Sequence, residues 1–263
     1  RQLARRLHGD AILTSNVESG GDIIDQVAAL GFIRRQTDEP WVSCNSSAAT
    51  LLTWYRNNVL HLFAAPSLVA LLVSRAKAGI QERHLAEQCR IFYPFVAQEL
   101  TINEALALEP VLQALSDMGL ITRRDGYLRP ASKPGEPYTQ LAQLSTLLLE
   151  MLQRLYVVIC IANQASLERD ELRSISQASA RKLARLFGLQ GAEFSEDRLF
   201  DLFIDGLISK QYLSTDERDR LIASSLLQQV AEQAAEQVIE PAIHQALLRV
   251  IAGELEKRGP SST

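Results

Sequence analysis

The feature that most constrains the fold is a recurring unit, in which a helical pattern stops at a glycine and two short strands follow. Residues 23–30 place apolar side chains at helical spacing and end at Gly31, and residues 32–43 predict two strands around a polar turn. The same order recurs over residues 111–129, where a glycine ends the helix and an Asp-Gly pair marks the hairpin turn. A weaker copy spans residues 199–214. The sequence therefore predicts a mainly α protein, a helical domain with short β-hairpins.

A helix followed by a short hairpin is the closing half of a winged-helix module, so these units are winged-helix-like. Such modules bind DNA in some proteins and serve packing or dimerisation in others, because one fold hosts many functions. The chain has 27 Lys and Arg residues against 31 Asp and Glu residues, which gives a net charge of −4. DNA-binding domains typically carry a basic excess. The charge balance therefore argues against nucleic acid as a partner.

Proline and glycine divide the chain into parts. Residues 133–137 (Lys-Pro-Gly-Glu-Pro) predict a linker. We expect residues 1–132 to form an N-terminal helical part with two helix–hairpin units, residues 138–258 a C-terminal helical part, and residues 259–263 a flexible tail. The chain begins at Arg1, shows no signal peptide and enters a helical pattern at once. We interpret this start as a boundary within a longer polypeptide, artificial or natural.

Two apolar stretches raise the question of membrane insertion. Residues 59–73 are interrupted by His61 and Pro66 and fall short of the ~20 residues that span a bilayer. Residues 147–162 contain a glutamate, a glutamine and an arginine. We predict that neither stretch is transmembrane. Both are interpreted as core helices, with a helix on the membrane surface as the alternative.

Reactive residue types are present, but their spacing does not fit a reactive or metal-binding site. Cys44, Cys89 and Cys160 are far apart, which fits neither a metal site nor a disulfide framework. The four histidines lack a second ligand at metal-site spacing, and no phosphate-binding glycine loop or nucleophile elbow occurs. Arg34 and Arg35 could bind an anion, but a hairpin explains them without a ligand. We therefore predict no metal and no cofactor.

The densest polar cluster is the segment at residues 53–61. Asn57 and His61 are four residues apart and would share one helix face. We interpret the cluster as a buried hydrogen-bonded network that holds this helix, with contact to a ligand or partner as the alternative. The candidate residues are Tyr55, Arg56, Asn57, Asn58 and His61.

This segment, Thr-Trp-Tyr-Arg-Asn-Asn-Val-Leu-His, and its continuation Pro-Ser-Leu-Val-Ala at residues 66–70 closely resemble a signature of bacterial membrane-associated glycerol-3-phosphate 1-O-acyltransferases, in their C-terminal region. Further similar segments follow in the family's order, so that the resemblance covers about residues 22–215. They are residues 91–100, 111–121, 178–183, 193–194 and 212–214.

The resemblance implies an enzyme that transfers a fatty acyl group from acyl-carrier protein or acyl-CoA to the 1-hydroxyl of glycerol 3-phosphate, in phospholipid synthesis. The family's general base is the histidine of a His-x-x-x-x-Asp motif. The residues five positions after the four histidines are Leu13, Pro66, Cys89 and Arg249, so the motif is absent, as is the family's Phe-Pro-Glu-Gly block. No catalytic residue is therefore assigned, and this segment is predicted to be inactive alone.

We expect a non-catalytic role: support of an N-terminal acyltransferase domain, shaping of the acyl-donor side, or peripheral contact with the cytoplasmic face of the inner membrane. Two alternatives stay open. One is a winged-helix regulatory or protein-interaction module, and the other is an interaction protein descended from the enzyme.

Overall fold

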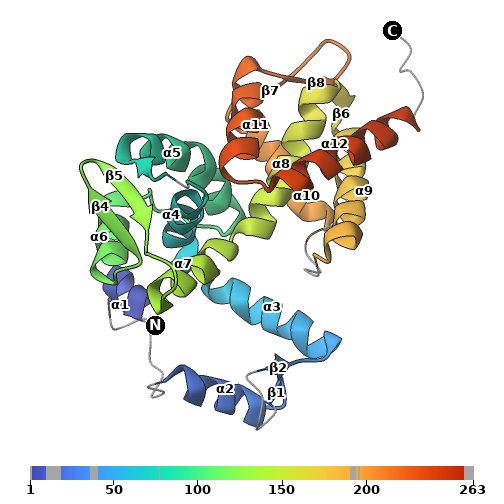
Figure 1. Cartoon of the computed structure of the whole chain (residues 1–263). Helices are drawn as coiled ribbons and strands as arrows, with labels where there is room; N and C mark the ends of the chain where they lie inside the picture. Colours follow the sequence, from blue (N-terminus) through green and yellow to red (C-terminus); the bar gives the residue numbers. More distant parts are fainter. Residues whose placement is uncertain are drawn as a thin grey trace. The chain divides into compact units, whose positions relative to one another are not determined.

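The computed structural model describes residues 2–9, 19–35, 41–76, 78–189, 194 and 196–257 (Figure 1). Most of these residues are helical, and the strands form small antiparallel sheets, which confirms the mainly α prediction. The chain divides into two compact units, Arg1–Leu62 and Phe63–Thr263, each of which is described by itself. The turn expected within the first hairpin and the predicted tail lie outside the described residues.

The first unit is small, and few of its described side chains are buried. Its elements are α1 (Gln2–His8), α2 (Gly20–Ala29), β1 (Arg34–Arg35), β2 (Val42–Ser43) and α3 (Ser46–Leu60). A capping box at Ser19 starts α2, and the side chain of Asn45 caps the first turn of α3. The strands β1 and β2 pair antiparallel, with Arg34 opposite Ser43, which confirms the first predicted helix–hairpin unit.

The second unit contains the same sequence of elements twice. After a short 3-10 turn, η2 (His61–Phe63), the first repeat comprises α4 (Ala64–Arg75), β3 (Ile80–Gln81), α5 (Glu82–Glu99), α6 (Leu108–Asp117), β4 (Ile121–Arg124) and β5 (Tyr127–Pro130). The second repeat comprises α8 (Leu149–Gln164), β6 (Leu167–Glu168), α9 (Arg169–Phe187), α10 (Asp197–Ser209), β7 (Leu213–Thr215) and β8 (Arg220–Ala223). In each sheet the strand that comes last in the sequence lies in the middle, in the orders β3-β5-β4 and β6-β8-β7. The described residues therefore form two winged helices in tandem.

Three further helices complete this unit: α7 (Glu136–Thr146) between the repeats, and α11 (Ser225–Gln237) and α12 (Pro241–Glu256) after them. The predicted linker, residues 133–137, lies between β5 and α7. However, α7 packs against α4 of the first repeat, so this helix belongs with the elements that precede the linker. The predicted boundary itself stays a prediction.

One helix ending recurs in all three helix–hairpin units. The second residue after the helix adopts a left-handed conformation, with φ of 78° at Gly31, 67° at Gly119 and 60° at Gln211. In each unit the following amide donates back to a carbonyl in the last turn, as Leu120 N does to Leu115 O at 2.9 Å and Tyr212 N to Leu207 O at 2.9 Å. This pattern is the Schellman ending, which favours glycine. Glycine occupies the left-handed position in the first two units, whereas a glutamine occupies it in the third.

The core follows the two apolar stretches found in the sequence. Residues 68–73 of α4 and residues 151–162 of α8 are buried, including Gln153 and Arg154. Among the described residues, one helical stretch, Ser47–Arg75, is long and apolar enough to cross a membrane, and α7 with α8 pass only as a pair bent by 42°. Core helices pass this test as well. The burial of α4 and α8 fits their interpretation as core helices.

The two winged helices are joined through α5. Arg154 of α8 forms a buried ion pair with Glu99 at the end of α5. From the neighbouring position on α5, Gln98 Nε2 donates to Leu202 O of α10 at 3.0 Å. A Cβ atom at Gly206 would lie only 2.4 Å from Gln98 Oε1, so the glycine permits this close approach.

Candidate functional site

The predicted polar cluster lies on α3 and the turn after it, and most of it is on the surface. Tyr55, Arg56, Asn58 and His61 are exposed, and Asn57 is half-buried. Arg56 donates to Asn57 Oδ1 from Nε and Nη2, both at 3.3 Å. The expected buried network is therefore wrong. Contact with a ligand or partner, the alternative, stays a prediction.

Beside the polar cluster runs an apolar stripe. Leu51, Tyr55 and Val59 follow at intervals of four along α3 and are 41%, 54% and 47% exposed. The tyrosine ring also contacts Phe32, at 6.2 Å between ring centroids. Other large apolar side chains of this unit are exposed as well: Ile23, Leu30, Trp41 and Val42. We call these seven residues with exposed apolar side chains the α3 surface.

Little of the first unit is buried. All of α2 is described, and none of its residues is buried, although its apolar residues lie on one side. The buried apolar residues described in this unit are Leu3, Ala4, Ala48 and Leu60. An exposed apolar stripe such as Leu51, Tyr55 and Val59 is typical of surfaces that bind a partner.

The histidines do not form an acid–base pair of the kind used in acyl transfer. His8 Nε2 lies 2.9 Å from Leu62 O, and His244 Nδ1 lies 2.6 Å from Tyr156 Oη. His84 lies beside a carboxylate, but Nδ1 is 3.6 Å from Glu87 Oε2, beyond hydrogen-bonding distance. No metal-binding group of His, Cys, Asp and Glu occurs among the described residues. Sequence reasoning missed the His84–Glu87 pair, although its spacing of three residues on a helix could have indicated it.

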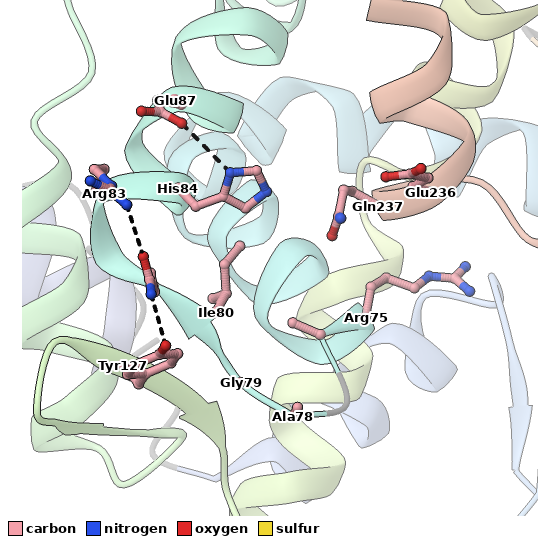
Figure 2. Close-up of a pocket in the computed structure, with 12 residues that line it drawn as sticks. Arg75, Ala78, Gly79, Ile80, Arg83, His84, Glu87, Tyr127, Glu236 and Gln237 are labelled. Atoms are coloured by element: carbon pink, nitrogen blue, oxygen red, sulfur yellow. Dashed lines mark hydrogen bonds and ion pairs between the residues drawn. The ribbon is translucent and has the colours of Figure 1, made fainter.

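A polar cavity of about 690 Å³ opens at the start of α5 (Figure 2). His84 points into it from the first turn of α5, towards Gln237 at the end of α11. Some of the other polar groups bond to one another: Arg83 donates to Gln81 at 3.3 Å, and Gln81 donates to the Tyr127 hydroxyl at 2.7 Å. Arg75 pairs with Glu240 outside the cavity, at 3.3 Å. With both charge signs present and these bonds already made, the cavity shows no preference for one class of ligand.

A second cavity, of about 600 Å³, lies between α5 and residues 103–108. We call it the α5 groove. Small and apolar side chains make up most of its wall, while Arg90, Asn103 and Glu104 are exposed at its edge. The other lining residues are Ala86, Cys89, Tyr93, Pro94, Ala97, Ala105, Leu106 and Leu108.

Two titratable side chains of the α5 groove stay neutral. Burial raises the pKa of the Cys89 thiol to about 12, so the thiolate is absent at neutral pH. Burial, and then the charge of Glu104, raise the pKa of Tyr93. Neither side chain is therefore a nucleophile at neutral pH. The groove was not predicted from the sequence, although small residues spaced along one side of α5 were a signal for it.

The winged helices show an acidic face where DNA-binding relatives of this fold place their recognition helix. In α10, Asp201 and Asp205 are held by Arg169 and Arg173 of α9, with Arg169 Nη1 2.6 Å from Asp205 Oδ1. Asp197 lies one turn earlier on the same side. In α6 the carboxylate of Glu109 pairs with Arg123 of β4 at 2.5 Å. Arginine side chains neutralise these paired carboxylates, so the arrangement decides neither for nor against nucleic acid.

Comparison with known proteins connects the fold to a family. The model for the glycerol-3-phosphate acyltransferase C-terminal region matches residues 1–216. The glycerol-3-phosphate acyltransferase of Pseudomonas paraeruginosa is 32% identical over 224 residues, that of Pseudomonas syringae pv. syringae 31% and that of Pseudomonas fluorescens 30%. Each alignment covers 81% of this chain but 27% of the relative, so the chain spans about a quarter of the length of these proteins. The chain therefore belongs to the family of the glycerol-3-phosphate acyltransferase C-terminal region.

Proposed function

We propose that this chain is a non-catalytic part of a glycerol-3-phosphate 1-O-acyltransferase that docks onto, and supports, a separate catalytic region. The observation that carries this proposal is the α3 surface. It exposes Leu51, Tyr55 and Val59 in a unit with few buried residues, next to the polar cluster that resembles the family's signature. Relatives that are matched over only 27% of their length contain enough additional polypeptide to cover such a surface.

The distribution of side chains also supports a non-catalytic role. The described histidines lack a hydrogen-bonded carboxylate, and the buried cysteine of the α5 groove is protonated. General-base catalysis of acyl transfer requires an oriented base near the hydroxyl that it activates. We infer that such a base, the acyl donor and glycerol 3-phosphate bind to the catalytic region. Peripheral contact with the inner membrane stays a prediction.

The test is a charge placed on the α3 surface of the complete gene product that contains this chain. The variant Leu51→Asp should reduce acyltransferase activity at least tenfold, because docking would bury a carboxylate against apolar side chains. Leu226→Asp on α11 is the matched control, since Leu226 is 54% exposed and lies outside this surface. It should keep full activity.

Two control measurements use the isolated chain. The isolated 263-residue chain should melt at the same temperature with and without Leu51→Asp, because the surface is exposed within its unit. The isolated chain should also lack acyltransferase activity. Activity in the isolated chain, equal effects of Leu51→Asp and Leu226→Asp, or a complete gene product without a catalytic region would each overturn the proposal.

The main alternative, a winged-helix regulator, predicts binding to duplex DNA. Such binding should be strongest at low salt and weaken as salt is added, because phosphate contacts release counterions. The net charge of −4 argues against this outcome. A fluorescence-anisotropy titration with labelled duplex at low salt distinguishes the two functions.

A further inference from the structure

The α5 groove has the form of a site for a linear apolar ligand. Its wall follows one side of α5 from Ala86 to Ala97, which is about 16 Å of helix at 1.5 Å per residue. Its volume of about 600 Å³ lies within the range typical of small-molecule sites. A compact ligand would leave much of such a groove empty, whereas a chain that lies along the helix would contact its whole length.

The chemistry of the wall favours hydrocarbon. Alanine, proline and leucine side chains form most of it, and the two polar groups set into the wall are neutral because burial raises the pKa of Cys89 and of Tyr93. Such a wall offers few hydrogen bonds, so a polar chain would lose its hydration without compensation, whereas methylene groups would gain from burial.

The edge of the groove carries one charge of each sign. Arg90 is exposed, and among the described residues no carboxylate forms an ion pair with it. Glu104 also lies at the edge, close enough to raise the pKa of Tyr93. A carboxylate or phosphate head would therefore be attracted by Arg90 and repelled by Glu104. Neutralising Arg90 and neutralising Glu104 should therefore change the affinity for an anionic ligand in opposite directions.

We propose that the α5 groove binds the hydrocarbon tail of a fatty acyl ligand, with the anionic head of the ligand beside Arg90. The choice of a fatty acyl ligand rests on the proposed function, because acyl chains are the apolar substrates of an acyltransferase. The groove holds the chain without reacting with it. Its ligand is an acyl compound bound outside the catalytic region, which the winged helices could sense or retain.

The experiment titrates the isolated chain with decanoate, dodecanoate and tetradecanoate below their micelle concentrations, by isothermal titration calorimetry. The dissociation constant should fall roughly tenfold for each two methylenes added, until the groove is full. Ala97→Phe and Ala86→Phe fill the groove and should weaken dodecanoate binding at least tenfold. Ala242→Phe, at an exposed site on α12, is the matched control and should leave binding unchanged.

The edge residues test the head group. Arg90→Gln should weaken dodecanoate binding several-fold, and Glu104→Gln should strengthen it, while neither change should affect dodecanol. Arg124→Gln serves as the control, since Arg124 is 84% exposed on the wing and lies outside the groove. Variants are compared only where their circular dichroism and melting temperature match those of the parent chain.

The outcomes separate this proposal from the proposed function. The acyl-chain site would be overturned if the dissociation constant did not depend on the chain length of the fatty acid. It would also be overturned if dodecanoate bound unchanged to both folded alanine-to-phenylalanine variants. If the isolated chain binds no fatty acid but Ala97→Phe prevents assembly of the complete enzyme, the groove holds a protein segment and the acyl-chain proposal is wrong. The role of the α3 surface is judged independently, by Leu51→Asp.

Discussion

Replacing Arg154 by methionine should destabilise the chain more than any surface change, because it removes the buried guanidinium that neutralises the Glu99 carboxylate. The guanidinium and carboxylate side chains are 3% and 8% exposed, and they connect α8 of one winged helix to α5 of the other. Removing one partner of such a pair typically costs about 3–5 kcal/mol. That is a large part of the ~5–15 kcal/mol by which proteins of ordinary stability resist unfolding.

Urea denaturation followed by circular dichroism measures this loss. With a slope of about 3 kcal/mol per molar urea, the midpoint should fall by about 1–1.7 M. The double variant Arg154→Met with Glu99→Leu removes both charges and should recover most of the lost stability, because apolar residues of similar volume can replace a buried pair. The coupling between the two sites should then exceed about 2 kcal/mol.

The prediction is contradicted if Arg154→Met lowers the free energy of unfolding by less than about 1 kcal/mol. It is also contradicted if the loss in the double variant equals the sum of the losses in the two single variants. Either result would mean that Glu99 reaches water when its partner is lost. A change in slope rather than midpoint would instead show that the two winged helices unfold separately.

Four further predictions concern single sites. Gln211→Gly should raise the unfolding free energy by about 0.5–1 kcal/mol in urea denaturation, because φ is 60° at this helix ending, and Gly119→Ala should lower it by about 1 kcal/mol. Gly206→Ala should cost about 1–3 kcal/mol in the same assay, since its methyl group would displace the Gln98 amide from Leu202 O. Iodoacetamide at pH 8 should modify the exposed Cys44 quickly and the buried Cys89 slowly, as peptide mapping can show, because the pKa of Cys89 is raised to about 12. The backbone amides of Arg220 and then Arg218 donate to Asp216 and lower the pKa of its carboxyl group. The contribution of Asp216 to stability is therefore present above its unfolded pKa of about 4 and is lost as the pH falls through the lower native pKa. Asp216→Asn should reduce the pH dependence of the melting temperature below pH 4.

The helix–hairpin units were predictable because their signals are local. Gly31 and Gly119 stop helices, and Asp125-Gly126 turns a hairpin, so a few neighbouring residues decide the conformation. The opening halves of the winged helices were not predicted. Their first strands are two residues long and pair with distant partners, Ile80 with Leu128 and Leu167 with Leu221. Such pairing is decided by tertiary packing, which no local pattern records.

The candidate sites were less predictable for a related reason. The sequence identified the Tyr55–His61 cluster by its composition, but burial depends on which elements pack against α3, and the expected network was misplaced. The α5 groove depends on how residues 103–108 lie across one side of α5. A single helix pattern shows that small side chains share a side, but it does not show whether another element fills the space beside them.

The packing of α7 on α4 bears on how this protein can be dissected. A piece that stops at residue 132 would contain α4 without the helix that covers it, and its apolar residues would face water. A piece that starts at residue 138 would begin with a helix whose partner is missing. Cutting near Leu147 and Leu148, between α7 and α8, gives each winged helix its own covering helices and is the better choice for separate expression.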